Sequence, residues 1–204
     1  MNPADTNTFE KKPEVILFGG CNGAGKTTLA FRLLGEGLHL YEFVNADEIA
    51  RGLNPMNPYN QAGLASRLAI ERVNTLIKER ASFAFEGTLS GKWQSKILAQ
   101  CNALGYHTRL IYVWLPSVEL AIERVAQRVE EGGHTVPTPL IQRRYNAGLE
   151  NLQTLYLPVA SDAIILDGTS LDMETHHRVI AYKRNDTFNI LQPEKWSVLC
   201  QKKK

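Results

Sequence analysis

The feature that most constrains this chain is a glycine-rich stretch, residues 16–30, which reads ILFGGCNGAGKTTLA. It fits the spacing G-x-x-x-x-G-K-[ST] of a phosphate-binding loop (P-loop) from Gly20 to Thr27. Glycines let the backbone curl so that its N–H groups point inward, and a following helix adds further N–H groups. An apolar run, residues 15–18, precedes the loop, and helix-forming residues, 26–34, follow it. The stretch therefore predicts a binding site for a nucleoside triphosphate.

Two residues of the loop have specific expected roles. Lys26 would reach the β- and γ-phosphates, and Thr27 would give its hydroxyl to Mg²⁺. The competing interpretation is a glycine-rich turn with a chance lysine, and the strand and helix patterns on either side argue against it. The other loop residues expected to contact the nucleotide are Gly20, Asn22, Gly23, Ala24, Gly25 and Thr28.

The overall composition narrows the class of protein. At 204 residues we expect one domain, with a core over about residues 14–170 and a C-terminal appendage over about 176–200. A formal net charge of +2 argues against a nucleic-acid partner. No run approaches the roughly 18 apolar residues of a membrane span, so no membrane association is expected. Three cysteines far apart in the sequence favour reduced thiols and a cytoplasmic location.

Short apolar runs alternate with helical patterns along the chain. This order predicts an α/β fold of the P-loop NTPase type: three layers, a mostly parallel five-stranded sheet, a helical lid and a small C-terminal hairpin. In such sheets ligands bind beyond the carboxyl ends of the strands. The hairpin is expected to be peripheral because it is an edge element and contains Pro193. The expected strands are 15–19, 41–45, 82–86, 107–114 and 162–166, and the expected helices are 26–34, 60–80, 91–104, 117–130 and 137–156.

Acidic residues follow two of the expected strands. Asp47 comes just after the second strand, and Glu86 ends the third, with Thr88 and Ser90 beyond it. A carboxylate within hydrogen-bond reach of an acceptor hydroxyl can take its proton, and Asp47 is the candidate for this general base. Glu86 is a candidate for holding the acceptor hydroxyl or for binding Mg²⁺ through water. Thr88 and Ser90 are candidate acceptor contacts. The competing role for Asp47 is the N-cap of a helix that follows it.

An arginine-rich stretch, residues 123–145, predicts a lid. Its sequence is ERVAQRVEEGGHTVPTPLIQRRY, two helical segments joined by a Gly-Gly break. Closure of such a lid would bring guanidinium groups to the transferring phosphoryl group and exclude water. The alternative is a set of solvated helix faces paired with neighbouring glutamates. The candidate residues are Arg124, Arg128, Arg143 and Arg144, with His134 in the break as either a loop cap or a phosphate contact.

Together these motifs resemble the zeta-toxin-like P-loop kinases, and more narrowly their compact, often stand-alone bacterial branch. The resemblance spans roughly residues 14–197, with a late hairpin ending in PEKW. It rests on the segments GGCNGAGKTTLA, FVNADEIARGLNP, FEGTLSG and RVEEGGHTVPTPLIQRRYNAGLENL. It implies that ATP binds at the P-loop and that Asp47 is the base that activates a sugar hydroxyl. It further implies that Glu86 and Thr88 contact the acceptor and that Arg124 contacts the phosphates.

The resemblance also implies an acceptor. The toxin members phosphorylate UDP-N-acetylglucosamine on the 3′-hydroxyl of its amino sugar. A small-molecule acceptor, first of all a nucleotide sugar, is therefore expected here, and an antitoxin is a candidate partner. One difference concerns the lid, because His134 stands near the place of a second lid arginine in the toxins. A histidine is a weaker clamp near neutral pH, and Arg143 or Arg144 could replace that arginine.

Two other functions stay open at this point. One is a kinase for another hydroxyl acceptor, such as a metabolite, an antibiotic or a nucleic-acid end. The other is a nucleotide-dependent switch or ATPase that acts on a protein partner. A kinase should hydrolyse ATP slowly alone and faster with its acceptor, whereas a switch should respond to a protein and ignore small hydroxyl compounds.

Overall fold

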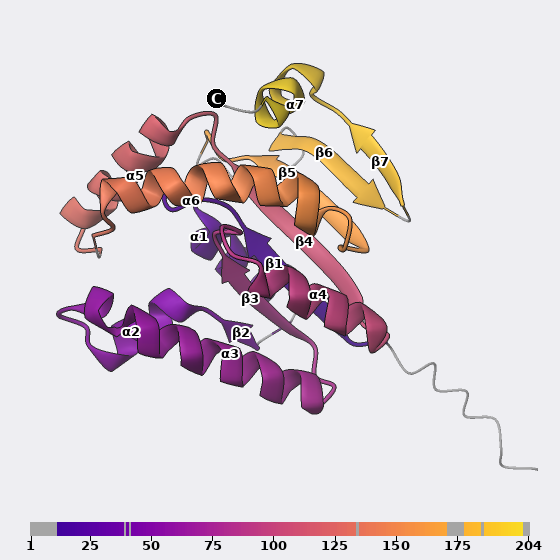
Figure 1. Ribbon diagram of the computed structural model, residues 1–204, viewed down its shortest axis with the longest axis horizontal. Helices are drawn as coiled ribbons and strands as arrows, with labels where there is room; N and C mark the ends of the chain where they lie inside the picture. Colours follow the sequence, from indigo (N-terminus) through magenta and orange to yellow (C-terminus); the bar gives the residue numbers. More distant parts are fainter. Residues whose placement is uncertain are drawn as a thin grey trace, which may run out of the picture.

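A computed structural model describes residues 12–38, 40, 42–133, 135–170, 178–184 and 186–201 of the chain. Within these residues seven strands form one sheet in the order β2-β3-β1-β4-β5-β6-β7 (Figure 1). The pairs β2–β3, β3–β1, β1–β4 and β4–β5 are parallel, whereas the β5–β6 and β6–β7 pairs are antiparallel. Their bounds are β1 (Glu14–Gly19), β2 (Phe43–Val44), β3 (Phe83–Gly87), β4 (His107–Trp114), β5 (Asp162–Asp167), β6 (Val179–Arg184) and β7 (Thr187–Ile190).

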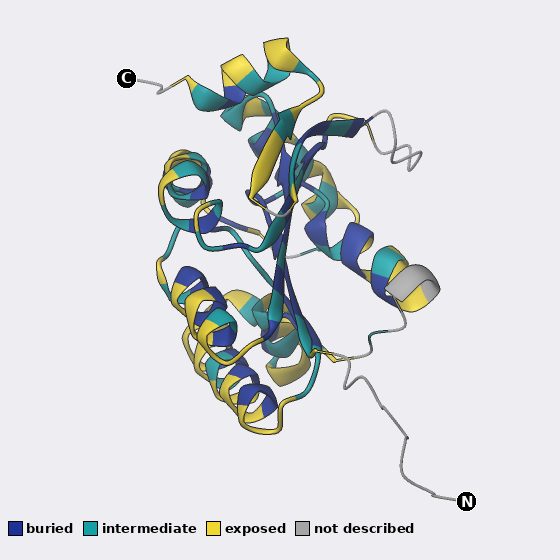
Figure 2. Cartoon of the chain, turned by 90° about the vertical axis from the view of Figure 1, so that its right-hand side faces the viewer, coloured by how far each residue is buried: buried dark blue, intermediate teal, exposed yellow. Residues whose placement is uncertain are grey.

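Helices cover both faces of the sheet, which is therefore the middle of three layers, with the buried residues gathered along it (Figure 2). Because alternate residues of a strand point to opposite faces, β1 contributes to two cores. Val15 and Leu17 belong to the core with α3 and α4, and Ile16 and Phe18 to the core with α1 and α5. The helices are α1 (Lys26–Arg32), α2 (Ala46–Leu53), α3 (Ala62–Lys78), α4 (Trp93–Ala103), α5 (Val118–Glu130), α6 (Thr138–Asn151) and α7 (Pro193–Cys200). Shorter turns are π-helical over Leu33–Leu38 and Leu152–Tyr156, and 3₁₀ over Pro58–Gln61.

The strand register brings the predicted motifs to one edge of the sheet. Gly19, which enters the P-loop, pairs with Gly87 at the end of β3. Val44, which ends β2, pairs with Phe85 in the same strand. The segments that follow β1, β2 and β3 therefore leave the sheet side by side at the carboxyl ends of the strands, where α/β proteins bind their ligands.

The C-terminal hairpin differs from its sequence prediction. It extends the sheet to seven strands instead of standing apart from a five-stranded one. Ile180 and Ala181 are fully buried, because β6 pairs with an edge of β5 whose backbone groups would otherwise lack partners. The residues after Gln192 form α7, since a proline fits the first turn of a helix. Residues 176 and 177 of the predicted segment lie outside the described residues.

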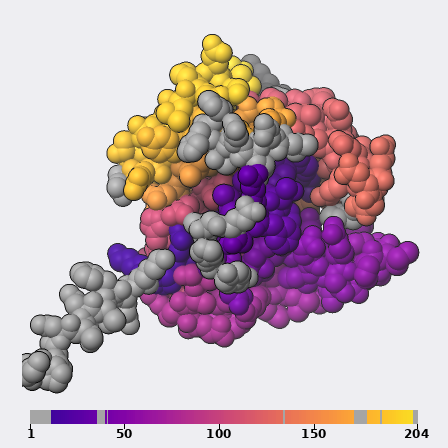
Figure 3. All heavy atoms as spheres, turned by 180° about the vertical axis from the view of Figure 1, so that it is seen from behind, coloured from indigo at the N-terminus to yellow at the C-terminus, as the bar shows by residue number. Residues whose placement is uncertain are grey.

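Seen from behind, the C-terminal elements and the α2–α3 pair lie at opposite ends of the molecule (Figure 3). None of the described helices combines the length and the apolar character that a membrane crossing requires.

Candidate active site

The P-loop has the backbone that its glycines allow. Gly20, Gly23 and Gly25 have φ angles of 145°, 79° and 86°, which residues with a Cβ rarely adopt. A Cβ on Gly23 would also lie 2.8 Å from the Ala121 carbonyl oxygen of α5. Glycine is therefore required at this position both by the turn and by the close approach of a helix.

The other loop residues fill distinct places. The Lys26 side chain is buried, and its Nζ donates to the Cys21 carbonyl oxygen at 2.9 Å. Asn22 is buried as well, Ala24 packs into the core beneath the loop, and Thr28 is exposed on α1. The lysine thus lies folded against its own loop, at the place where loops of this kind bind phosphates.

Glu86, near the end of β3, is linked directly to the P-loop. Thr27 Oγ1 donates a hydrogen bond to Glu86 Oε2 at 2.8 Å. Burial raises the pKa of Glu86 above its usual value, while Lys26 and Thr27 lower it. The carboxylates of Asp47 and Glu48 raise the same pKa further. Hydroxyl and carboxylate oxygens are the ligands that Mg²⁺ prefers, and this pair therefore fits the donor set of a magnesium site.

Asp47 lies on the first turn of α2, but it does not cap that helix. The N-cap is Asn45, whose Oδ1 accepts hydrogen bonds from the backbone N–H groups of Asp47 and Glu48 at 2.8 and 3.2 Å. The interpretation of Asp47 as an N-cap is therefore wrong, because Asn45 already satisfies those N–H groups. The Asp47 side chain is exposed and lines the adjacent pocket.

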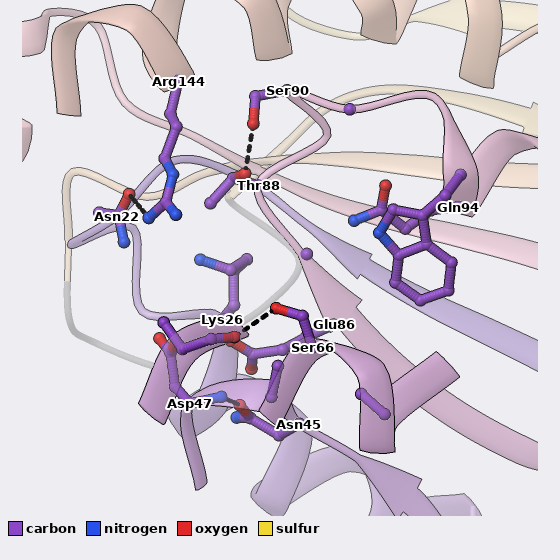
Figure 4. A pocket seen from close by; sticks show the side chains of 16 residues that line it. Asn22, Lys26, Asn45, Asp47, Ser66, Glu86, Thr88, Ser90, Gln94 and Arg144 are labelled. Carbon is purple, nitrogen blue, oxygen red and sulfur yellow. Dashed lines mark hydrogen bonds between the residues drawn. The ribbon is translucent and has the colours of Figure 1, made fainter. Parts of the chain in front are cut away.

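These residues surround a pocket of about 260 Å³ (Figure 4). Figure 4 shows Asp47, Lys26 and Glu86 on one side of this pocket, and Thr88, Ser90 and Gln94 on the other. The hydroxyl oxygens of Thr88 and Ser90 lie 2.8 Å apart, within hydrogen-bond distance. The full lining is Asn22, Lys26, Asn45, Ala46, Asp47, Ala62, Ser66, Ala69, Glu86, Gly87, Thr88, Ser90, Gly91, Trp93, Gln94 and Arg144.

Arg144 is the predicted lid arginine that reaches this pocket. Its Nη1 donates to Asn22 Oδ1 of the P-loop at 3.3 Å. Burial lowers the pKa of Arg144, while the Asp47 carboxylate raises it. The next residue, Tyr145, donates its hydroxyl to the Leu115 carbonyl oxygen at 2.8 Å and so fixes α6 against the end of β4. Arg143, by contrast, is exposed and lines a separate hollow beside α7.

The two arginines of α5 lie elsewhere. Arg124 donates from Nη1 to the Gly168 carbonyl oxygen at 2.6 Å and from Nη2 to that of Thr169 at 2.7 Å. It therefore ties α5 to the loop that follows β5, and it does not line the pocket. Arg128 is half-buried one turn further along, next to Gly133. The predicted contact His134 lies outside the described residues.

Gln94 of α4 was not among the residues predicted from the sequence. It is only 6% exposed and lines the pocket. Tyr156 contacts this glutamine. The Tyr156 hydroxyl oxygen lies 3.1 Å from Gln94 Oε1 and 2.6 Å from the Gly91 carbonyl oxygen. The position of Gln94 as the second residue of the helix that follows β3 was a usable signal, because ligands bind at that edge of the sheet. Tyr156, 62 residues away, carries no such signal.

Comparisons with known proteins agree with this architecture. A family model described as an AAA domain matches residues 15–155. An uncharacterized protein from Haemophilus influenzae is 31% identical over 132 residues, which are 65% of this chain and 92% of that protein.

Several solved structures share the fold at lower identity. Chains of the AvrRxo1-ORF1:AvrRxo1-ORF2 complex, solved with sulphate ions and with ATP, have TM-scores of 0.74 and 0.73 at 16% and 17% identity. Each match covers 96% of this chain but only 66% and 65% of the other, so this chain spans about two thirds of their length. The PezAT chromosomal toxin–antitoxin system of Streptococcus pneumoniae gives a TM-score of 0.59 at 22% identity, over 78% of this chain and 68% of that one. A candidate kinase from Chloroflexus aurantiacus has a TM-score of 0.58 at 19% identity, over 80% of this chain and 94% of that one.

The predicted α/β P-loop fold is thereby confirmed, and the resemblance to zeta-toxin-like kinases is confirmed as a likeness of fold.

Proposed function

The chain belongs to the AAA domain family, and from this premise we propose that it is an ATP-dependent kinase that phosphorylates a hydroxyl group of a small molecule. The observation that carries the proposal is the pocket of about 260 Å³. Around this space lie the P-loop lysine, the Thr27–Glu86 pair and the Asp47 carboxylate. A donor site and a candidate base thus face the same cavity, which a reaction between two bound substrates requires.

The donor half consists of the P-loop and its neighbours. ATP would bind with its phosphates along residues 20–28, where Lys26 leaves the Cys21 carbonyl oxygen to contact them. Mg²⁺ fits beside the loop because Thr27 and Glu86 offer oxygen ligands only 2.8 Å apart. When bound with ATP, the ion neutralises negative charge on the phosphates. Arg144, already hydrogen-bonded to the loop through Asn22, would add a guanidinium group to the same end of the pocket.

The acceptor half contains the candidate base. Asp47 takes the proton of the acceptor hydroxyl while the hydroxyl oxygen attacks the γ-phosphorus. One oxygen–phosphorus bond forms to the acceptor, and the bond from the γ-phosphorus to the bridging oxygen breaks. ADP leaves with the electrons of that bond, and the proton stays on the Asp47 carboxyl until solvent removes it.

The resemblance to zeta-toxin-like kinases makes a nucleotide sugar, UDP-N-acetylglucosamine, the first acceptor to assay. The same resemblance, together with a fold shared with chains of a toxin–antitoxin system, supports a test for a protein partner.

The test is transfer of labelled γ-phosphate from ATP to a panel of hydroxyl compounds that includes UDP-N-acetylglucosamine and free sugars, with water alone as the control reaction. We expect a labelled product with at least one of these compounds from the wild type, and none from Lys26→Ala. Asp47→Asn should bind ATP but transfer at least about 10²-fold more slowly, the usual contribution of a general base. If label appears only as free phosphate with every hydroxyl compound tried, and a protein partner alone stimulates that release, the chain is a switch and not a kinase.

A further inference from the structure

We infer that the acceptor is an uncharged molecule rich in hydroxyl groups, a free sugar or polyol about one ring in size, and that Gln94 binds it at the wall of the pocket away from the P-loop. This inference rests on the proposed kinase function and narrows its acceptor. It departs from the nucleotide sugar of the family resemblance, because charge, size and hydrogen bonding in the pocket favour a neutral ligand.

The charges of the pocket are the first reason. Among the described residues that line it, the cations are Lys26 and Arg144. Lys26 contacts the P-loop residue Cys21, and Arg144 lies between Asn22 of the loop and the Asp47 carboxylate. The acids of the lining are Asp47 and Glu86, so two carboxylates already face the two cations. ATP brings its own negative charges to this site, and an acceptor with further phosphate groups would find no additional cation among the described lining residues.

The size of the pocket is the second reason. Its volume of about 260 Å³ lies just below the roughly 300–1,000 Å³ of pockets that enclose a drug-sized ligand. A single ring with its hydroxyl groups is a small ligand on that scale. A sugar joined to a nucleotide would extend well beyond the described lining.

The fixed position of Gln94 is the third reason. The Tyr156 hydroxyl oxygen lies 3.1 Å from Gln94 Oε1. A Cβ on Gly87 would lie only 2.3 Å from Gln94 Nε2, so the amide fills the space that the glycine leaves open. The amide oxygen is therefore within hydrogen-bond distance of Tyr156 and the amide nitrogen packs against Gly87, and Figure 4 shows the amide directed toward the pocket.

This wall matches the hydrogen bonding of hydroxyl groups. An amide and two hydroxyls can donate and accept, as the hydroxyls of a sugar do. Trp93, also in the lining, packs against Phe85 with a ring-centroid distance of 5.7 Å. It adds an aromatic surface for the apolar face of a ring, and a few placed polar groups among apolar ones are the usual composition of a small-molecule site.

The charge of the acceptor can be tested directly. A small-molecule extract of bacterial cells is separated on an anion exchanger into unretained neutral compounds and retained anions. Each fraction is then incubated with the protein, Mg²⁺ and γ-labelled ATP, in parallel with N-acetylglucosamine and UDP-N-acetylglucosamine as defined probes. We expect a labelled organic product from the neutral fraction. A product from the retained fraction alone, or from UDP-N-acetylglucosamine alone, overturns the inference and leaves the kinase proposal standing. Label in free phosphate only overturns both.

The role of Gln94 is tested on the neutral acceptor by Gln94→Met, which keeps the volume and removes the amide. We expect KM for the acceptor to rise on the order of 10-fold or more, the usual effect of losing one buried hydrogen bond. Gln100→Met, on the exposed face of the same helix, is the matched control and should leave this KM unchanged.

Tyr156→Phe tests the positioning of the amide without changing the amide itself. Like Gln94→Met, it should raise KM for the acceptor, with kcat nearly unchanged. It should have little further effect in the Gln94→Met background, because the two residues act through one contact. An unchanged KM in Gln94→Met, with wild-type thermal unfolding, overturns the role of Gln94. Additive effects of the two substitutions overturn the positioning by Tyr156.

Discussion

Replacing Glu86 by glutamine should raise the stability of this protein at neutral pH and lower its phosphoryl-transfer activity. Burial raises the pKa of the Glu86 carboxyl, although Lys26 and Thr27 lower it. The folded state therefore disfavours the ionised form.

Below the usual glutamate pKa the Glu86 carboxyl is protonated in the folded and in the unfolded protein, and its contribution to the free energy of unfolding is fully present. As pH rises through the raised folded-state pKa, that contribution is lost. Glutamine cannot ionise and keeps an oxygen that can accept the Thr27 hydrogen bond. The variant should thus gain stability over the wild type at neutral pH, but not in acid.

The size of this gain follows from linkage. Each unit by which the folded-state pKa exceeds the unfolded one corresponds to about 1.4 kcal/mol at pH values above both. For a domain of this length, about 1 kcal/mol shifts Tm by roughly 2–4 °C. Phosphoryl transfer should instead fall on the order of 10²-fold or more, because the proposed Mg²⁺ site loses its carboxylate.

The assay is thermal unfolding of wild type and Glu86→Gln across pH 4 to 8 without nucleotide, together with transfer rates over a Mg²⁺ titration. Glu71→Gln, an exposed acid on α3, is the matched control and should follow the wild type in both. The reasoning is refuted if the variant is no more stable at neutral pH, or if its stability gain is equal at all pH values. Full transfer at ordinary Mg²⁺ would remove Glu86 from the metal site.

Three further substitutions address the base, the lid and the core. Asp47→Asn should leave ATP binding near wild type and cut transfer at least about 10²-fold, measured by γ-phosphate transfer and nucleotide titration; a wild-type rate would exclude Asp47 as the base. Arg144→Ala should lower kcat on the order of 10²-fold, whereas its neighbour Arg143→Ala should not, since Arg143 lies outside the pocket; equal losses would contradict the assignment of Arg144. Leu110→Ala, at a fully buried position of β4, should lower the free energy of unfolding by about 2–5 kcal/mol in a urea titration.

The donor half of the site could be predicted from the sequence because its chemistry is local. The glycines of the P-loop adopt φ angles that few other residues tolerate, and the lysine and threonine follow within two positions. The position of Glu86 at the end of an apolar run predicted that it lies on the same edge of the sheet as the P-loop, whereas its hydrogen bond with Thr27 depends on the pairing of β1 with β3. The sheet was predicted with five strands because nothing local in the hairpin shows that β6 pairs with β5. The cap of α2 is by contrast a local feature, and Asn45 occupies it, which removes the competing role of Asp47 and leaves its role as the base a prediction.

The acceptor half depends instead on contacts between distant residues. Arg144 meets Asn22 across 122 positions of sequence, and Tyr156 meets Gln94 across 62. The sequence offered four lid arginines, and the resemblance favoured Arg124 as a phosphate contact. The packing of α6, fixed by the hydrogen bond from the Tyr145 hydroxyl to the Leu115 carbonyl oxygen just after β4, instead brings Arg144 to the pocket. The residues that bind the acceptor can therefore differ between two chains that share the same P-loop. For this reason the P-loop indicates nucleotide binding, whereas the reaction and its acceptor have to be inferred from the side chains that the tertiary structure brings to the wall of the pocket.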